Sequence, residues 1–215
     1  MSASPSPVSM NPKVIATPPG ATATTARVDN TVLRNALAGQ HGLLRGIDLV
    51  ENQLARSKRG APADVPFPLV GEEARIYHKG SISAYVHSLE MVSSDCVRKL
   101  FQSLGPEPDD EAAMGAQNHL MAKMLFGKYG VTNGADVIEK CLAVATRAEH
   151  GDAPFPMDAA QGAVWHRASG AAYQYVLEML CIDSLKQLAP RFDGLAFQPD
   201  VSDIGEDDVP AAPAM

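Results

Sequence analysis

Apolar side chains recur along this chain three and four positions apart, the spacing that places them on one face of a helix. Leu33 and Leu37 form one such stripe, and Ile82, Tyr85 and Leu89 form another. No segment sustains the period of two that is expected for a strand. The pattern therefore predicts an all-α fold with six helices, which lie over about 30–41, 46–59, 72–104, 112–129, 134–149 and 158–189.

The chain matches itself when it is shifted by 88 residues. Residues 84–92 read AYVHSLEMV, and residues 172–180 read AYQYVLEML. Between residues 30–100 and 118–188, 23 of 71 positions are identical without a gap, which is far beyond chance. The sequence therefore predicts an internal tandem duplication of a three-helix unit, with two pseudo-symmetric halves.

The segments outside the repeat have a different composition. The N-terminal segment is rich in Pro, Ala, Ser and Thr and the C-terminal segment is acidic, and neither has the periodic apolar residues that a core requires. We expect a flexible arm, a first helical repeat, an acidic linker, a second helical repeat and an acidic flexible tail, at residues 1–28, 29–104, 105–116, 117–192 and 193–215.

The formal net charge of −7 comes from the segments between and after the repeats. The linker carries four anions and the tail six, with no cation in either, whereas residues 1–28 carry two cations and no anion. The two helical repeats are close to neutral. This distribution weakens the case for a polyanion-binding domain, which usually has a clustered basic face.

The composition limits the compartment and the class of protein. No stretch approaches 18 consecutive apolar residues, so we expect no membrane-spanning helix, and the first thirty residues lack the apolar core of a secretory signal. The three cysteines lie 45 and 40 residues apart, which is neither a disulfide framework nor a zinc site. We therefore expect a cytoplasmic, reducing location, and core thiols at Cys96, Cys141 and Cys181.

Three polar residues recur in both halves at positions i, i+3 and i+7 of the longest predicted helix. They are His78, Ser81 and Tyr85, and then His166, Ser169 and Tyr173. The favoured interpretation is a buried polar row, and the alternatives are a small-molecule pocket or a metal site. Di-iron bundles use Glu-x-x-His on two helices, whereas this chain has the reverse order and in one half only, so we predict no metal and no cofactor.

Other repeated residues have structural explanations. We assign the repeated glycines, such as Gly46 and Gly134, to turns and close helix contacts. Phe67 and Phe155, each between two prolines, are expected to fill the core, although an exposed docking motif is the alternative. The acidic pairs kept three residues apart near the start of a helix suit the helix dipole. Since no nucleophile elbow, phosphate loop or zinc-protease motif is present, we expect no enzyme activity.

The favoured function is a non-enzymatic structural protein that self-associates or binds a protein partner, through two similar surfaces and the flexible arms. Another possibility is a ligand-binding protein or metal-dependent enzyme that uses the repeated His-Ser-Tyr row. A membrane partner is not expected.

A Pro/Ala/Ser-rich arm before a helical core and an acidic tail also resembles, in composition alone, the helical coat proteins of filamentous RNA viruses, including Pro/Ala/Ser-rich ones of some fungal viruses. The resemblance implies a second function, the coating of a nucleic acid, and a virion location. The candidate nucleic-acid contacts are Arg45, Arg56, Lys58, Arg59, Lys79 and Arg167.

Overall fold

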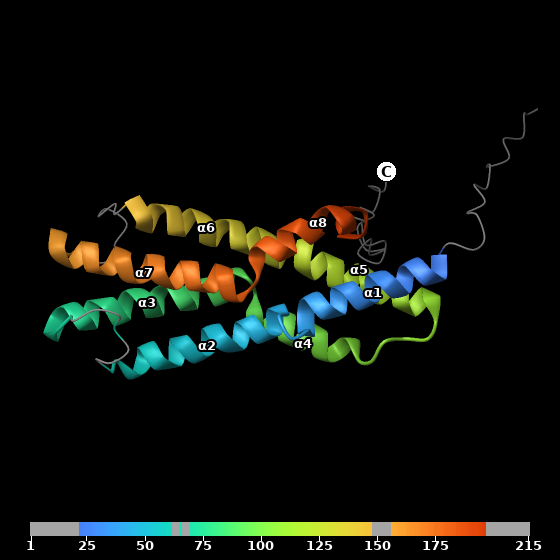
Figure 1. Cartoon of the computed structure of the whole chain (residues 1–215), viewed down its shortest axis with the longest axis horizontal. Coiled ribbons are helices and arrows are strands. Elements are labelled where there is room, and N and C mark those ends of the chain that lie inside the picture. Colours follow the sequence, from blue (N-terminus) through green and yellow to red (C-terminus); the bar gives the residue numbers. More distant parts are fainter. Residues whose placement is uncertain (1–21, 62–64, 66–68, 148–155, 197–215) are drawn as a thin grey trace, which may run out of the picture.

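The helices of this protein form a long rod (Figure 1). The computed structural model describes residues 22–61, 65, 69–147 and 156–196, and all regular structure within them is helical, which confirms the all-α prediction. The eight helices of these residues are α1 (Thr22–Ala38), α2 (Leu43–Arg59), α3 (Gly71–Met91), α4 (Ser94–Leu104), α5 (Glu111–Phe126), α6 (Val131–Arg147), α7 (Ala159–Met179) and α8 (Ile182–Ala196).

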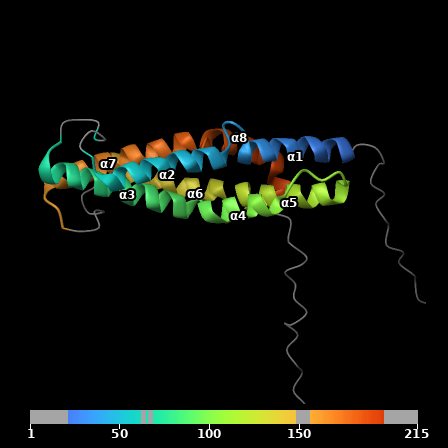
Figure 2. The same cartoon turned by 90° about the horizontal axis from the view of Figure 1, so that it is seen from below.

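Each half of the chain is a long helical hairpin whose two arms are interrupted near the middle of the rod (Figures 1 and 2). In the first half α1 and α2 run to one end of the rod, and α3 and α4 return. In the second half α5 and α6 run out, and α7 and α8 return. One end of the rod therefore consists of α2, α3, α6 and α7, and the other of α1, α4, α5 and α8.

The two hairpins lie side by side, with α3 packed along α7 in the same chain direction. A Cβ built on Gly80 would lie 3.1 Å from Cβ of Ala168, and further along the helices the ring of Tyr85 meets the edge of Tyr175 with centroids 6.2 Å apart. The glycine and alanine at this contact let the two backbones approach closely.

The structure divides the longest predicted helix of each half, so each half has four helices rather than three. The helix predicted over 72–104 is interrupted at Ser93 and the one over 158–189 at Cys181, both with φ of 50°. A residue in this left-handed region cannot continue the hydrogen-bond ladder of an α-helix. The interruption also turns the next helix, so Val97 is buried while Cys96 is exposed.

The expectation of three core thiols is therefore wrong for Cys96. Cys141 and Cys181 are each partly buried.

The first and last helices are longer than the sequence pattern predicts. Residues 22–28, which we assigned to the N-terminal arm, form the first turns of α1, and the side-chain amide of Asn118 on α5 donates a hydrogen bond of 2.8 Å to the carbonyl of Ala26. At the other terminus α8 continues to Ala196, because Phe192 stacks on Phe126 with centroids 5.8 Å apart. The expectations for Phe67 and Phe155 lie outside the described residues.

Two reciprocal contacts join the hairpins at the middle of the rod. A Cβ at Gly46 of α2 would overlap the backbone carbonyl oxygen of Met179, and a Cβ at Gly134 of α6 would overlap that of Met91. The first glycine lets the first turns of α2 lie against the C-terminal end of α7, and the second lets those of α6 lie against the C-terminal end of α3. Close approach is thus the physical reason for a glycine at this position of both halves.

Two ion-pair clusters fasten α4 to α2 and α8 to α6. Nη2 of Arg98 lies 2.6 Å from a carboxylate oxygen of Asp48 and 2.8 Å from one of Glu51. In the second half Nζ of Lys186 lies 2.7 Å from both Asp136 and Glu139. We had assigned these acids to the helix dipole. Because α2 and α6 begin three residues earlier than predicted, the acids lie in the second and third turns and face a cation instead.

The first prediction concerns the glycine contacts. Gly46→Ala should lower the free energy of unfolding by about 1–3 kcal/mol, because the added methyl must displace the backbone at Met179. Gly115→Ala is the matched control, since nothing lies within 4 Å of a Cβ at that helical position, and it should raise stability by about 0.5–1 kcal/mol. Urea unfolding measures both. Equal midpoints for the two variants would contradict the close packing.

Candidate functional site

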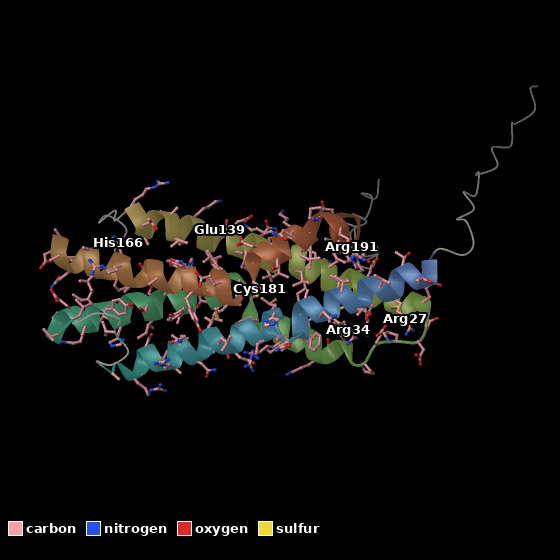
Figure 3. All side chains as sticks on the ribbon, in the orientation of Figure 1. Arg27, Arg34, Glu139, His166, Cys181 and Arg191 are labelled. Atoms are coloured by element: carbon pink, nitrogen blue, oxygen red, sulfur yellow. The ribbon has the colours of Figure 1, made fainter. Side chains whose placement is uncertain are left out.

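The second-half members of the His-Ser-Tyr row line a pocket of about 490 Å³ between α3, α6 and α7. His166, Ser169 and Tyr173 all come from α7, and Figure 3 places His166 toward the end of the rod that is opposite to Arg27 and Arg34. We call this hollow the α3–α6–α7 pocket. The described residues that complete its wall are Ser83, His87, Val137, Lys140, Cys141, Val144, Ala145 and Trp165.

Both histidines of the row are buried, as we predicted, with 7% of His78 and 4% of His166 exposed. Nε2 of His78 is buried and has no hydrogen-bond partner among the described residues. Ser169 is also buried, and its hydroxyl donates to the backbone carbonyls of Trp165 at 3.0 Å and His166 at 3.2 Å. The serine of this row therefore bonds to its own helix.

The tyrosines of the row contact the opposite hairpin. The hydroxyl of Tyr173 lies 3.5 Å from Nδ1 of His87, and the two rings meet edge to face with centroids 6.2 Å apart. In the other half the equivalent contact is between Tyr85 and Tyr175, also at 6.2 Å. The serine of the second-half row thus bonds within its own helix, whereas the tyrosines of both halves pack against the opposite hairpin.

The polar side of the α3–α6–α7 pocket combines a phenol, a thiol and an imidazole. Burial raises the pKa of Tyr173 above its usual range, and the charge of the Cys141 thiolate and a hydrogen bond to it raise the pKa further. Tyr173 therefore keeps its proton at neutral pH and can donate a hydrogen bond. No Asp or Glu occurs among the described residues that line the pocket, so no carboxylate is at hand there for acid–base chemistry.

Sequence reasoning found only part of this pocket. It identified His166, Ser169 and Tyr173 because they recur in both halves. It missed His87 and Lys140, where the other half has Tyr175 and Asn52. A comparison of the two halves that looked for differences in size and charge would have contained this signal.

Only three of the six candidate nucleic-acid contacts lie together. Arg56, Lys58 and Arg59 occupy the last turn of α2 and are exposed, and Arg147 is exposed in the last turn of α6 at the same end of the rod (Figure 1). We call these four cations the basic end.

The other three candidates lie elsewhere. Lys79 and Arg167 are exposed at corresponding positions of α3 and α7. Arg45 lines a separate hollow near the middle of the rod, together with the acids Asp48 and Glu178. The six candidates therefore do not form one continuous basic face.

Two further properties of the described residues bear on function. They contain no group of three or more His, Cys, Asp or Glu side chains placed to hold a metal ion. None of their helices combines the length and the apolar character that crossing a membrane requires.

Comparison with known proteins adds no assignment. No family model, no curated protein and no solved structure matches this chain. The functional argument therefore depends on the geometry and charge of the chain itself.

The second prediction follows from the burial of Tyr85. Its burial, and the charges of Tyr175 and Tyr77, raise its pKa to about 12. The unfolded chain ionises this phenol near pH 10, so its contribution to stability is complete below pH 10 and is lost between pH 10 and 12. The loss should reach about 2–3 kcal/mol, measured by urea unfolding at several pH values.

Tyr85→Phe should remove that part of the alkaline destabilisation. Tyr129→Phe is the control, because Tyr129 is 86% exposed, and it should leave the pH dependence unchanged. Identical pH profiles for Tyr85→Phe and the original protein would contradict the burial of an un-ionised phenol at this position.

Proposed function

We propose that this chain is a non-enzymatic assembly protein whose copies associate end to end. In this assembly the acidic segment that follows α8 of one copy binds the basic end of the next copy. The supporting observation is the placement of charge. Three exposed cations occupy the last turn of α2 and one that of α6, at an end that also carries Glu72 and Glu73 of α3, while the acidic part of the sequence follows the helix that ends toward the other end.

The two charged elements are complementary. The basic end presents exposed Arg56, Lys58, Arg59 and Arg147, and after Arg191 the sequence contains no further Lys or Arg. A cation in the last turn of a helix is favoured by the dipole, and a group of such cations attracts an anionic segment most strongly at low ionic strength. The acids available after α8 are Asp200, Asp203, Glu206, Asp207 and Asp208.

Chain length favours contact with a second copy over contact within one copy. α8 has 15 residues and α6 has 17, and they run in opposite directions from the middle of the rod (Figure 1). At 1.5 Å per residue their ends are about 45–50 Å apart. Asp208 lies twelve residues after Ala196, which spans at most about 43 Å when fully extended. The acids could therefore reach the basic end of their own copy only from a fully extended segment, whose ordering costs conformational entropy.

We also propose that the two halves arose by tandem duplication of one hairpin. Four features that recur 88 residues apart support this history. They are the bounds of α2 and α6, the bounds of α3 and α7, the left-handed residues Ser93 and Cys181, and the ion pairs of Arg98 and Lys186.

Nucleic-acid coating is the alternative function, because the cations of the basic end are also the residue types that contact phosphates. It makes a different prediction about partners. RNA would bind the basic end in competition with the acidic segment, with an affinity that falls steeply as salt rises.

The third prediction tests the end-to-end contact by light scattering of the full chain. At about 50 mM salt we expect a mass above that of one copy, which falls toward 22.8 kDa at about 500 mM, because screening weakens the contact. Replacing Arg56, Lys58 and Arg59 by Glu should abolish the association at low salt. Lys99→Glu is a control for a single added negative charge, at an exposed position of α4 away from the basic end.

A charge exchange completes the test. A second variant, with the five acids between residues 200 and 208 replaced by Lys, should also fail to associate alone. Mixing it with the variant whose basic end is reversed should restore an assembly. If the original chain stays monomeric at low salt, or if the mixture does not associate, the end-to-end contact is wrong.

Any truncation of the N-terminal segment should stop at residue 21, because α1 begins at Thr22.

A further inference from the structure

The α3–α6–α7 pocket has the size and the walls of a small-molecule site. Its volume of about 490 Å³ lies within the range of ligand pockets, which runs from about 300 to 1,000 Å³. Trp165, although only 6% exposed, adds aromatic surface to the wall, and Val137 and Val144 supply apolar surface from α6. These walls suit a flat apolar body.

The charge of the pocket selects an anion. Lys140 is exposed among the lining residues, His87 is partly buried, and no Asp or Glu is present among the described residues of the lining. The hydroxyl of Tyr173 and the ring of His87 lie together on the polar side, and the one that accepts the hydrogen bond between them keeps an O–H or N–H that can donate to an acidic oxygen. An anionic group is thus met by one full charge and by a hydrogen-bond donor.

The pocket exists because the side chains around Tyr173 are smaller than those around Tyr85 at four equivalent places. Val137, Cys141, Val144 and His87 stand where the other half has Leu49, Gln53, Arg56 and Tyr175. Arg56 lies close enough to Tyr85 for its charge to lower the pKa of that phenol. At the equivalent place in the other half, the short side chain of Val144 lines the pocket with Tyr173. The surrounding framework is shared by the two halves, and only the space within it differs.

We propose that the α3–α6–α7 pocket binds a small organic anion with a flat apolar body, of the aromatic carboxylate or sulfonate class. The flat body packs on Trp165 and the valines of α6, and the acidic group lies toward Lys140, His87 and Tyr173. This binding function is independent of the end-to-end association, because none of the pocket residues belongs to the basic end.

The test uses 1-anilinonaphthalene-8-sulfonate as the probe. Trp165 is the one tryptophan of the chain, so energy transfer from tryptophan to the probe reports binding in the neighbourhood of this pocket, and the variants below assign it to the pocket. We expect saturable binding of one probe per chain. The uncharged analogue N-phenyl-1-naphthylamine, which has the same aromatic body, should bind about tenfold more weakly, because it lacks the anionic group.

Two variants and one control locate the site. Lys140→Gln should weaken binding of the sulfonate about fivefold and leave the uncharged analogue unaffected. Cys141→Gln introduces the side chain of the first half and should weaken binding of both probes more than tenfold by filling the pocket. Gln53→Cys is the matched control, the reverse change in the first half, and should leave binding unchanged. Circular dichroism establishes that each variant keeps its helices.

Cysteine labelling supplies a second readout that does not depend on fluorescence. The saturating sulfonate should slow maleimide labelling of Cys141 at least about fivefold, while labelling of exposed Cys96 stays unchanged. Mass spectrometry of the peptides separates the two sites. The proposal is overturned if folded Cys141→Gln binds the sulfonate as tightly as the original chain, if the uncharged analogue binds equally well, or if Cys141 is not protected.

Discussion

The parallel contact between α3 and α7 is the constraint on which the rest of the rod depends. Small buried residues face each other along it, Gly80 and Ala84 from α3 and Ala168 and Ala172 from α7. Their size lets the helices approach until dispersion contacts and burial of the flanking side chains hold them together. Because the two helices run in the same direction, the hairpins must lie side by side, and each α2 or α6 then crosses the opposite hairpin at a glycine.

This arrangement separates what the two halves share from what distinguishes them. The shared part is the skeleton: the interrupted helices, the glycine crossings and the ion pairs of Arg98 and Lys186. The differences lie in the side chains that this shared backbone carries. Smaller residues around Tyr173 open a pocket in one half, and the last turn of α2 carries three cations where that of α6 carries one. Both proposed functions use the differences.

The sequence predicts much of the fold and less of the site, for physical reasons. Helical periodicity located the main helices and the burial of His78 and His166. It missed the interruptions at Ser93 and Cys181, because neither residue is a Gly or Pro that would mark a break and the left-handed turn is imposed by the packing at mid-rod. The pocket was found only in part, because attention to repeated residues favours the common skeleton and overlooks Lys140 and His87.

The most direct measurement is a disulfide across the α3–α7 contact. Gly80→Cys and Ala168→Cys would be combined in a chain whose three natural cysteines are replaced by Ser. A Cβ at position 80 lies 3.1 Å from that of Ala168 and 2.9 Å from the carbonyl oxygen of Trp165. A small shift of α3 away from α7 relieves the second contact and brings the pair to the separation of about 3.5–4.5 Å found in disulfides. Mild oxidation should form this bond within one chain, and much faster than in Gly80→Cys/Ala172→Cys, one helical turn further along. No intramolecular bond, or equal rates for the two pairs, would contradict parallel packing in this register.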